Sequence, residues 1–325
     1  MRLIALEEHY RAPMIKAVTY AEGFNAALSS AADSPMAARL AKLDELGEER
    51  IADMDAGGID VQVLSHTVPA TEQLAPEQAV VLAAQANDHL AAAIARQPQR
   101  LAGFATLPMS APQAAADELE RTVREHGFKG ALINGHTQGR FLDDHFFAPI
   151  LERAQRLQVP IYVHPSEPPE VVRDAYYSGL PPAAAQMLAT AGWGWHVDTG
   201  LHALRLVLGG VFERLPDLQV IIGHMGEGLP FFLARSSRNL AQGTGLPRSL
   251  EQYLACNFHI TTSGMFTCPP LLCLLETLGA ERVMFSVDYP YSDNREGADF
   301  LARAPISEAD RERIAHGNAE RLLGL

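Results

Sequence analysis

Short apolar runs alternate along the chain with longer segments in which apolar residues recur at the spacing of an amphipathic helix. This alternation is typical of βα units, in which a helix follows each strand and neighbouring strands run parallel. The predicted strands are residues 3–7, 60–65, 101–107, 130–134, 160–164, 219–223, 259–262 and 283–287. Eight such units predict an α/β fold, a single (β/α)8 TIM barrel.

The helical segments and the loops between them agree with this architecture. The predicted helices are residues 39–56, 76–97, 111–126, 146–157, 202–214, 271–278 and 308–323. Gly57, Gly127 and Gly279 stand where such helices end. Proline-rich and polar stretches at residues 20–35, 167–169 and 181–182 are expected to be loops inserted at the rim. No repeat or second core is apparent, so one domain over residues 1–325 is expected.

Composition narrows the class of protein. A chain of 325 residues with 47% hydrophobic residues suits a barrel of roughly 250 residues with insertions. The net charge of −13 argues against binding to nucleic acid, and no apolar stretch is long enough for a membrane helix. Cys256, Cys268 and Cys273 lack metal-binding spacing and are expected to be reduced thiols of a cytoplasmic protein.

Polar residues stand at the C-terminal ends of six predicted strands, where barrel enzymes carry their active sites. These ends are Glu7-Glu8-His9, Ser65-His66, Asn134-Gly135-His136, His164, His224 and Asp288. Residues two apart on a strand share a face, so Glu7 and His9 point the same way and Glu8 points oppositely. The first end is therefore either a metal clamp or a wet strand end with a solvated or salt-bridged Glu8.

A metal site is the chemistry that these strand ends favour. Glu7, His9, His164 and Asp288 supply the nitrogen and oxygen donors that suit one Zn²⁺ or Mn²⁺ ion, with Mg²⁺ as a third candidate. The absence of thiolates near these positions disfavours a structural zinc site. Four protein ligands would leave room for water or substrate.

Four of the strand-end motifs carry a family resemblance: "LEEH", "VHP", "GHMGEGLPFFLAR" and "FSVDYPY". They resemble the metal-dependent amidohydrolase superfamily, and are most similar to its aromatic decarboxylases, among them gamma-resorcylate (2,6-dihydroxybenzoate) and 2,3-dihydroxybenzoate decarboxylases. The resemblance runs over most of the chain, to the closing "IAHGNAERLL". It implies one metal ion on the four residues named above, His224 and Glu227 as a catalytic pair, and a homodimer or homotetramer.

The resemblance implies non-oxidative decarboxylation of a hydroxybenzoate-type small molecule. The metal would chelate the carboxylate and the ortho-hydroxyl oxygen, and Asp288 would protonate the ring carbon. His224, oriented by Glu227, would hydrogen-bond the phenolic oxygen or relay protons. Hydrolytic relatives usually begin with His-x-His, so Glu7 at the first position favours non-hydrolytic chemistry. No lysine ends the fourth strand, because Lys129 precedes it, so one metal is expected.

Alternatives remain open at this point. A hydrolase or hydratase of the same superfamily would use Asp288 as a base on an amide, a lactone or an unsaturated acid, and a non-catalytic barrel would serve as a scaffold. Arg235 is a candidate for substrate binding or for a subunit contact. His66 and Trp193 are weaker substrate candidates. For them, and for His136, Trp195 and His196, structural roles at the rim compete with a place in the pocket.

Overall fold

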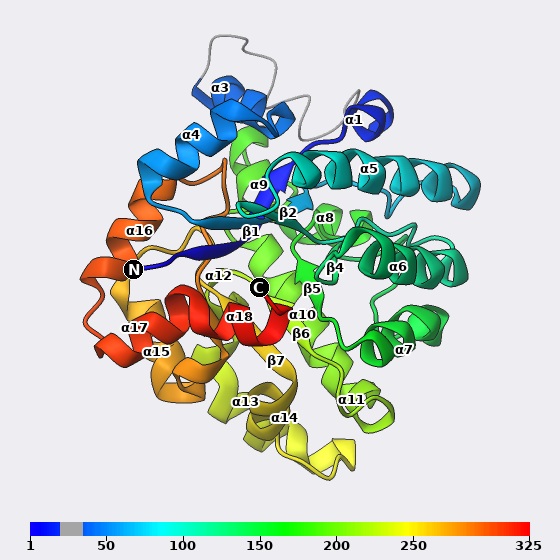
Figure 1. Ribbon diagram of the computed structural model, residues 1–325. Coiled ribbons are helices and arrows are strands. Elements are labelled where there is room, and N and C mark those ends of the chain that lie inside the picture. Colours follow the sequence, from blue (N-terminus) through cyan, green and yellow to red (C-terminus); the bar gives the residue numbers. More distant parts are fainter. Residues whose placement is uncertain (20–34) are drawn as a thin grey trace.

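The computed structural model describes residues 1–19 and 35–325, and eight parallel strands form a (β/α)8 barrel (Figure 1). The predicted fold class is confirmed. The strands are β1 (Ile4–Tyr10), β2 (Val61–His66), β3 (Leu101–Gly103), β4 (Ala131–Asn134), β5 (Ile161–His164), β6 (Val220–Ile222), β7 (Phe258–Thr261) and β8 (Val283–Met284).

The strands are hydrogen-bonded in sequence order around the barrel. β1, β2 and β3 form one parallel ladder, and β4 to β8 form a second. Between β3 and β4, the amide of Ala105 donates to the carbonyl of Gly130 at 2.8 Å. Between β8 and β1, the amide of His9 donates to the carbonyl of Tyr289 at 2.7 Å. These bonds join the two ladders into a closed ring.

Helices surround the strands on the outside of the barrel (Figure 1). They bury an apolar stripe against it, as Ala115 and Leu119 of α6 illustrate. Before β5 the helices are α1 (Pro13–Thr19), α3 (Pro35–Ala41), α4 (Glu48–Gly57), α5 (Pro76–Arg96), α6 (Pro112–His126) and α7 (Ala148–Leu157). After β5 they are α8 (Glu170–Tyr177), α9 (Pro182–Ala189), α10 (Gly194–Leu208), α11 (Val211–Arg214), α12 (His224–Glu227), α13 (Leu229–Thr244), α14 (Leu250–Asn257), α15 (Cys268–Leu278), α16 (Asn294–Arg303), α17 (Glu308–Glu312) and α18 (Asn318–Leu323).

Apolar side chains fill one end of the barrel interior. Alternate strand residues form an inner apolar cluster: Ile4, Leu6, Val61, Val63, Ala102, Phe104, Leu132, Tyr162, Ile221 and Met284. Ala319 and Leu323 of α18 belong to the same cluster, and Figure 1 shows α18 lying in front of the strands. The N-terminal end of the barrel is therefore plugged, and the polar strand ends lie at the opposite end.

Several predicted bounds change in the structure. β1 continues to Tyr10, whereas β3 and β8 are shorter than predicted. Beyond β8, Ser286 N donates to the side-chain oxygen Thr262 Oγ1 at 2.9 Å. The predicted loop at residues 167–169 precedes α8, whereas Pro182 of the predicted loop at residues 181–182 is the first residue of α9. Most of the predicted loop at residues 20–35 lies outside the described residues. None of the described helices is long and apolar enough to span a membrane.

Candidate active site

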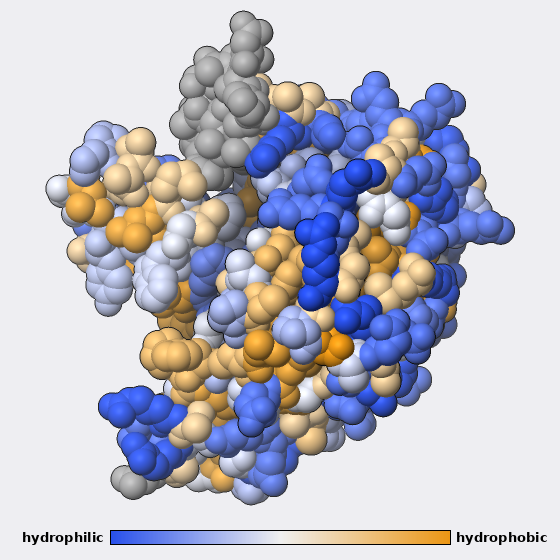
Figure 2. Space-filling view, turned by 90° about the vertical axis from the view of Figure 1, so that its left-hand side faces the viewer, coloured by the Kyte–Doolittle hydropathy of each residue, from blue (hydrophilic) through white to orange (hydrophobic). Residues whose placement is uncertain are grey.

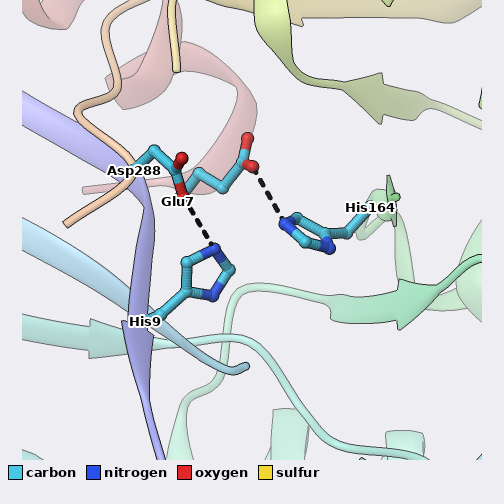
Figure 3. A group of neighbouring side chains, drawn as sticks. All are labelled: Glu7, His9, His164 and Asp288. Carbon is cyan, nitrogen blue, oxygen red and sulfur yellow. Dashed lines mark ion pairs between the residues drawn. The ribbon is translucent and has the colours of Figure 1, made fainter. Parts of the chain in front are cut away.

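The four predicted metal ligands converge at the C-terminal end of the barrel (Figure 3). Glu7 and His9 lie on β1, His164 ends β5, and Asp288 follows β8; their ligand atoms all lie within 4.8 Å of one another. His164 Nε2 is 3.2 Å from Glu7 Oε1. His9 Nε2 is 3.2 Å from Asp288 Oδ1. Segments from both ends of the chain thus meet at one point.

The two carboxylate oxygens of Glu7 have different surroundings. Three hydroxyl groups, from Tyr162, Thr261 and Ser263, donate to Oε2. Oε1 is buried and has no hydrogen-bond partner within residues 1–19 and 35–325. Gly223 leaves space for the carboxylate, because a Cβ at that position would lie 2.6 Å from Oε2. The hydroxyl groups therefore hold Oε2 and leave Oε1 available for a ligand bond.

The two histidines direct Nε2 into the same space. His164 Nδ1 lies 2.7 Å from the carbonyl oxygen of Pro165, and since a carbonyl only accepts, Nδ1 carries the proton. That tautomer leaves an Nε2 lone pair facing Glu7. His9 Nε2 is buried without a hydrogen-bond partner in the described part of the chain, and its Nδ1 is 3.4 Å from Ser65 Oγ. Both rings are oriented to bind through Nε2.

These donors fit a single divalent metal ion. Two imidazole nitrogens and two carboxylates are ligands that Zn²⁺ and Mn²⁺ accept. Glu7 Oε1 and His9 Nε2 are buried and, in the described part of the chain, each has an ion-pair neighbour at 3.2 Å but no hydrogen bond. A cation bound to both atoms would compensate for the missing hydrogen bonds. Four protein ligands also leave a coordination position for substrate or water.

Electrostatics favour the protonation states that bind metal. Burial alone would raise the pKa of Glu7, but the three neighbouring histidines hold it well below its usual range. Burial lowers the pKa of His9, and the neighbouring Asp288 carboxylate opposes only part of that effect. An ionised carboxylate therefore lies beside a neutral imidazole, as a metal site requires.

The alternative of a wet strand end with a solvated Glu8 is wrong. Glu8 is buried, and its carboxylate accepts hydrogen bonds from the amides of Val287 at 2.8 Å and Tyr289 at 3.2 Å. Because these amides flank Asp288, Glu8 holds the segment after β8 against β1. Burial raises the pKa of Glu8 to about 8, so the environment distinguishes it from the ionised Glu7 next to it.

Replacing Glu8 by Ala is expected to destabilise the fold by about 2–4 kcal/mol, because two buried backbone N–H groups lose their acceptor. Urea unfolding of the metal-free protein measures the effect as a lower midpoint. Glu49→Ala is the matched control, since Glu49 is exposed on α4 and should shift stability by less than about 0.5 kcal/mol. Equal midpoints for the two variants would contradict the role assigned to Glu8.

The predicted catalytic pair, His224 and Glu227, lies on a left-handed turn after β6. In α12, φ is positive at every residue, from 48° at His224 to 84° at Gly226. Gly226 and Gly228 adopt such angles without steric cost, whereas the other residues must be held there by their surroundings. The turn places His224 Nδ1 2.8 Å from Glu227 Oε1. Three of the six described non-glycine residues with positive φ are the predicted catalytic residues, the third being Asp288.

His224 faces two carboxylates. Burial would lower its pKa, but Glu227 and Glu7 raise it to about 10. Burial would raise the pKa of Glu227, but His224 and His196 lower it. His224 Nε2 lies 3.7 Å from Glu7 Oε1, at the edge of the metal-ligand group. The pair therefore presents a charged N–H donor to the same space as the four ligands.

Comparison with known proteins adds the family. Residues 31–325 match the family model described as Amidohydrolase. The chain belongs to the amidohydrolase family. The resemblance inferred from the strand-end motifs is confirmed, and the (β/α)8 barrel is the expected framework for it.

Similar amidohydrolase chains are decarboxylases by name. Decarboxylase orsB of Emericella nidulans is 39% identical, over 99% of this chain and 96% of that protein. The gamma-resorcylate decarboxylase of Polaromonas sp. is 37% identical, over 99% of this chain and 98% of that protein. These likenesses confirm the similarity to the aromatic decarboxylase branch.

Solved structures give the same result. The 5-carboxyvanillate decarboxylase of Novosphingobium aromaticivorans, in complex with manganese and 4-hydroxy-3-methoxy-5-nitrobenzoic acid, has a TM-score of 0.92 at 34% identity, covering 100% of this chain and 96% of that one. A dihydroxybenzoic acid decarboxylase from Polaromonas sp., with bound manganese and the inhibitor 2-nitroresorcinol, has a TM-score of 0.90 at 35% identity, covering 100% and 97%.

The three substrate contacts predicted for this amidohydrolase lie outside the group of four ligands. Arg235 is exposed on α13, and the side chain of Trp193 is 55% exposed. His66 is buried against the ring of Tyr10 at 5.4 Å, with Nδ1 2.6 Å from the carbonyl oxygen of Thr67. The structure therefore packs His66 against Tyr10 and leaves Arg235 and Trp193 at the surface.

A cavity of about 410 Å³ opens at the same end of the barrel. Asn134 and His136, which come from the end of β4, line it together with Trp195. Glu72 holds Asn134 in place, because its carboxylate accepts from the carboxamide at 3.0 Å. Trp195, rather than Trp193, is thus the tryptophan beside this cavity.

The hydroxyl groups that hold Glu7 were not predicted from the sequence, although a signal for them exists. Tyr162 stands two residues before His164 on β5, so both side chains point to the barrel interior. Thr261 and Ser263 are also two apart at the end of β7. Following the two-residue alternation along β5 and β7 would have identified these hydroxyl groups.

Proposed function

We propose that the protein is a metal-dependent, non-oxidative decarboxylase of hydroxybenzoate-type aromatic carboxylic acids, a carbon–carbon lyase. The observation that carries the proposal is the convergence of the four predicted ligands on one point, beside the His224–Glu227 pair. Similar proteins named as gamma-resorcylate and dihydroxybenzoic acid decarboxylases support the substrate class.

Each residue has a distinct task in this proposal. A divalent ion held by the four ligand residues would supply positive charge for the carboxylate and ortho-hydroxyl oxygens of the substrate. Asp288 takes the proton of the ortho-hydroxyl group and donates it to the ring carbon that bears the carboxylate. The carbon–carbon bond then breaks, CO₂ leaves, and the electron pair restores the aromatic ring. His224, held by Glu227, donates a hydrogen bond from Nε2 toward the phenolic oxygen.

The ligand set also distinguishes this reaction from hydrolysis. Glu7 replaces the first histidine of the His-x-His pair that hydrolytic relatives usually carry, and its lowered pKa keeps it negatively charged. The extra negative charge makes a bound ion a weaker activator of water. An amide or lactone hydrolase of the same family is the alternative that the experiment must separate.

Dihydroxybenzoate isomers with and without an ortho-hydroxyl group test the proposal. We expect the Mn²⁺- or Zn²⁺-loaded protein to decarboxylate 2,6- or 2,3-dihydroxybenzoate, followed by CO₂ release and loss of ultraviolet absorbance. The control is 3,5-dihydroxybenzoate, which lacks an ortho-hydroxyl group and should react more than about 100-fold more slowly. Turnover of lactones or amides, with no reaction of any ortho-hydroxybenzoate, would replace decarboxylation with hydrolysis.

We propose Mn²⁺ or Zn²⁺ as the metal, with Mg²⁺ as a weaker candidate, because the nitrogen and carboxylate donors suit the first two. The manganese in the two solved decarboxylase structures supports this order. The three cysteines are free thiols, and the cytoplasmic location expected from them stays a prediction.

A homodimer or homotetramer is the proposed assembly. Figure 2 shows hydrophobic patches on one face of the molecule. Large apolar side chains are exposed on four helices, α8, α9, α10 and α13: Val171, Tyr176, Met187, Val197, Leu201, Phe231 and Phe232. Exposed apolar surface of this kind is typical of a protein interface. The exposed Arg235 follows Phe231 and Phe232 on α13, which favours a subunit contact for it.

A further inference from the structure

A second histidine contacts the carboxylate that orients His224. His196, in the first turn of α10, has Nδ1 at 2.6 Å from Glu227 Oε2. His224 Nδ1 lies 2.8 Å from the other oxygen, Oε1. The rings of His196 and His224 lie 5.0 Å apart at 68°. The Glu227 carboxylate therefore bridges two imidazoles, and each imidazole contacts a different oxygen.

The hydrogen bonds assign a direction to this chain. The pKa of Glu227 is lowered, because the two histidines outweigh the effect of burial, so its carboxylate is ionised and only accepts. Both Nδ1 atoms must then donate. The arrangement leaves Nε2 of His224 facing the metal-ligand group, 3.7 Å from Glu7 Oε1. The Glu227 side chain is fully buried, whereas His196 retains 27% exposure at the outer end.

We propose that His196 is a positioning residue for the His224–Glu227 pair. The last torsion of a glutamate side chain is broad, so its rotamer alone does not fix the plane of the carboxylate. A donor on Oε2 fixes that plane and keeps Oε1 on His224 Nδ1. His196 thereby fixes the ring orientation of His224 without touching the substrate. The catalytic readout of this inference depends on the proposed function, but the structural readout does not.

The close approach of α10 to α12 supports this assignment. A Cβ at Gly200 would lie 3.1 Å from the backbone oxygen of Glu227, so the two helices are in direct contact one turn beyond His196. His196 Nε2 also lies 3.2 Å from the carbonyl oxygen of Ala191, which anchors the far side of the ring. The imidazole is thus held at both nitrogens, as a residue that positions another must be.

Two variants of His196 separate positioning from other roles. His196→Ala removes the donor, and we expect kcat to fall about tenfold with KM changed less than about twofold. His196→Asn places an amide N–H near the position of Nδ1, so it should restore kcat to within about threefold of the starting protein. Leu208→Ala is the matched control, because Leu208 is exposed at the far end of the same helix. An unchanged kcat in His196→Ala, or an Asn variant as slow as the Ala variant, would overturn the inference.

A substrate-free measurement keeps the test independent of the proposed function. In protein labelled with ¹⁵N-histidine, the Nδ1–H signal of His224, assigned with a His224→Gln variant, should persist in His196→Asn and be lost to exchange in His196→Ala. An unaltered signal in His196→Ala would overturn positioning even if no hydroxybenzoate reacts. The expected loss together with an inactive panel of substrates would reject the proposed function alone. The ligand atoms of His196, His224 and Glu227 also lie within 4.8 Å of one another, so these residues could themselves bind a metal ion. Titration with Zn²⁺ tests this alternative. A second equivalent of Zn²⁺ bound only when His196 is present would overturn positioning in favour of a metal site.

Discussion

Replacing Asp288 by Asn is expected to lower kcat by about 10³-fold or more while leaving the fold intact. The carboxamide has the shape of the carboxylate but cannot deliver a carboxylic proton to the ring carbon. Asp288 follows β8 in a left-handed conformation, with φ of 67°, and its Oδ1 is 3.2 Å from His9 Nε2. Asn tolerates this backbone conformation better than most residues, so strain should not confuse the result.

Because Asp288 is both a predicted ligand and the predicted acid, two measurements are needed. Manganese content, measured by mass spectrometry after loading with excess Mn²⁺, shows whether the variant still holds the ion. Circular dichroism and the urea midpoint report the fold. Asp299→Asn, at an exposed position on α16, is the matched control and should keep full activity. A metal-loaded Asp288→Asn protein with near-normal turnover would remove Asp288 from the role of acid.

Replacing His164 by Ala is expected to weaken Mn²⁺ binding by more than about 100-fold and to abolish turnover at micromolar metal. His164 is 4% exposed, and its Nε2 is one of only two histidine ligand atoms in the group of four. Without this nitrogen, two carboxylates and one imidazole remain, and the loss of a ligand bond weakens the site. Isothermal titration of the metal-free protein measures the change directly.

A surface histidine provides the comparison for this loss. His145→Ala should bind Mn²⁺ as the starting protein does, because His145 is exposed and is not among the four grouped ligand residues. Treatment with a chelator should abolish turnover of the starting protein and of His145→Ala. Added Mn²⁺ should restore turnover in both of these proteins but not in His164→Ala. If His164→Ala bound Mn²⁺ with unchanged affinity, the ligand group drawn in Figure 3 would not be the metal site.

The sequence by itself was sufficient for the architecture and for the ligand group. Period-two alternation in the strands and the rule that parallel strands end on one rim place Glu7, His9, His164 and Asp288 together without any coordinates. Local rules suffice here, because each ligand is at or near the end of its own strand. The helical spans were less well predicted, since the predicted set contains none of α8, α9 and α13.

Contacts across the barrel were decided only by the tertiary structure. In a regular strand, the side chain of Glu8 would point away from those of Glu7 and His9. The register of β1 against β2 is irregular between Ala5 and Glu8. The Glu8 carboxylate accepts a hydrogen bond from the amide of Val287 after β8 and is not exposed to water. Likewise, nothing in the sequence pairs His196 with Glu227, because these residues meet through the packing of α10 on a left-handed turn. Alternation along a strand is a local property of the backbone, whereas the partner of a buried polar group depends on which distant segment the closed barrel brings beside it.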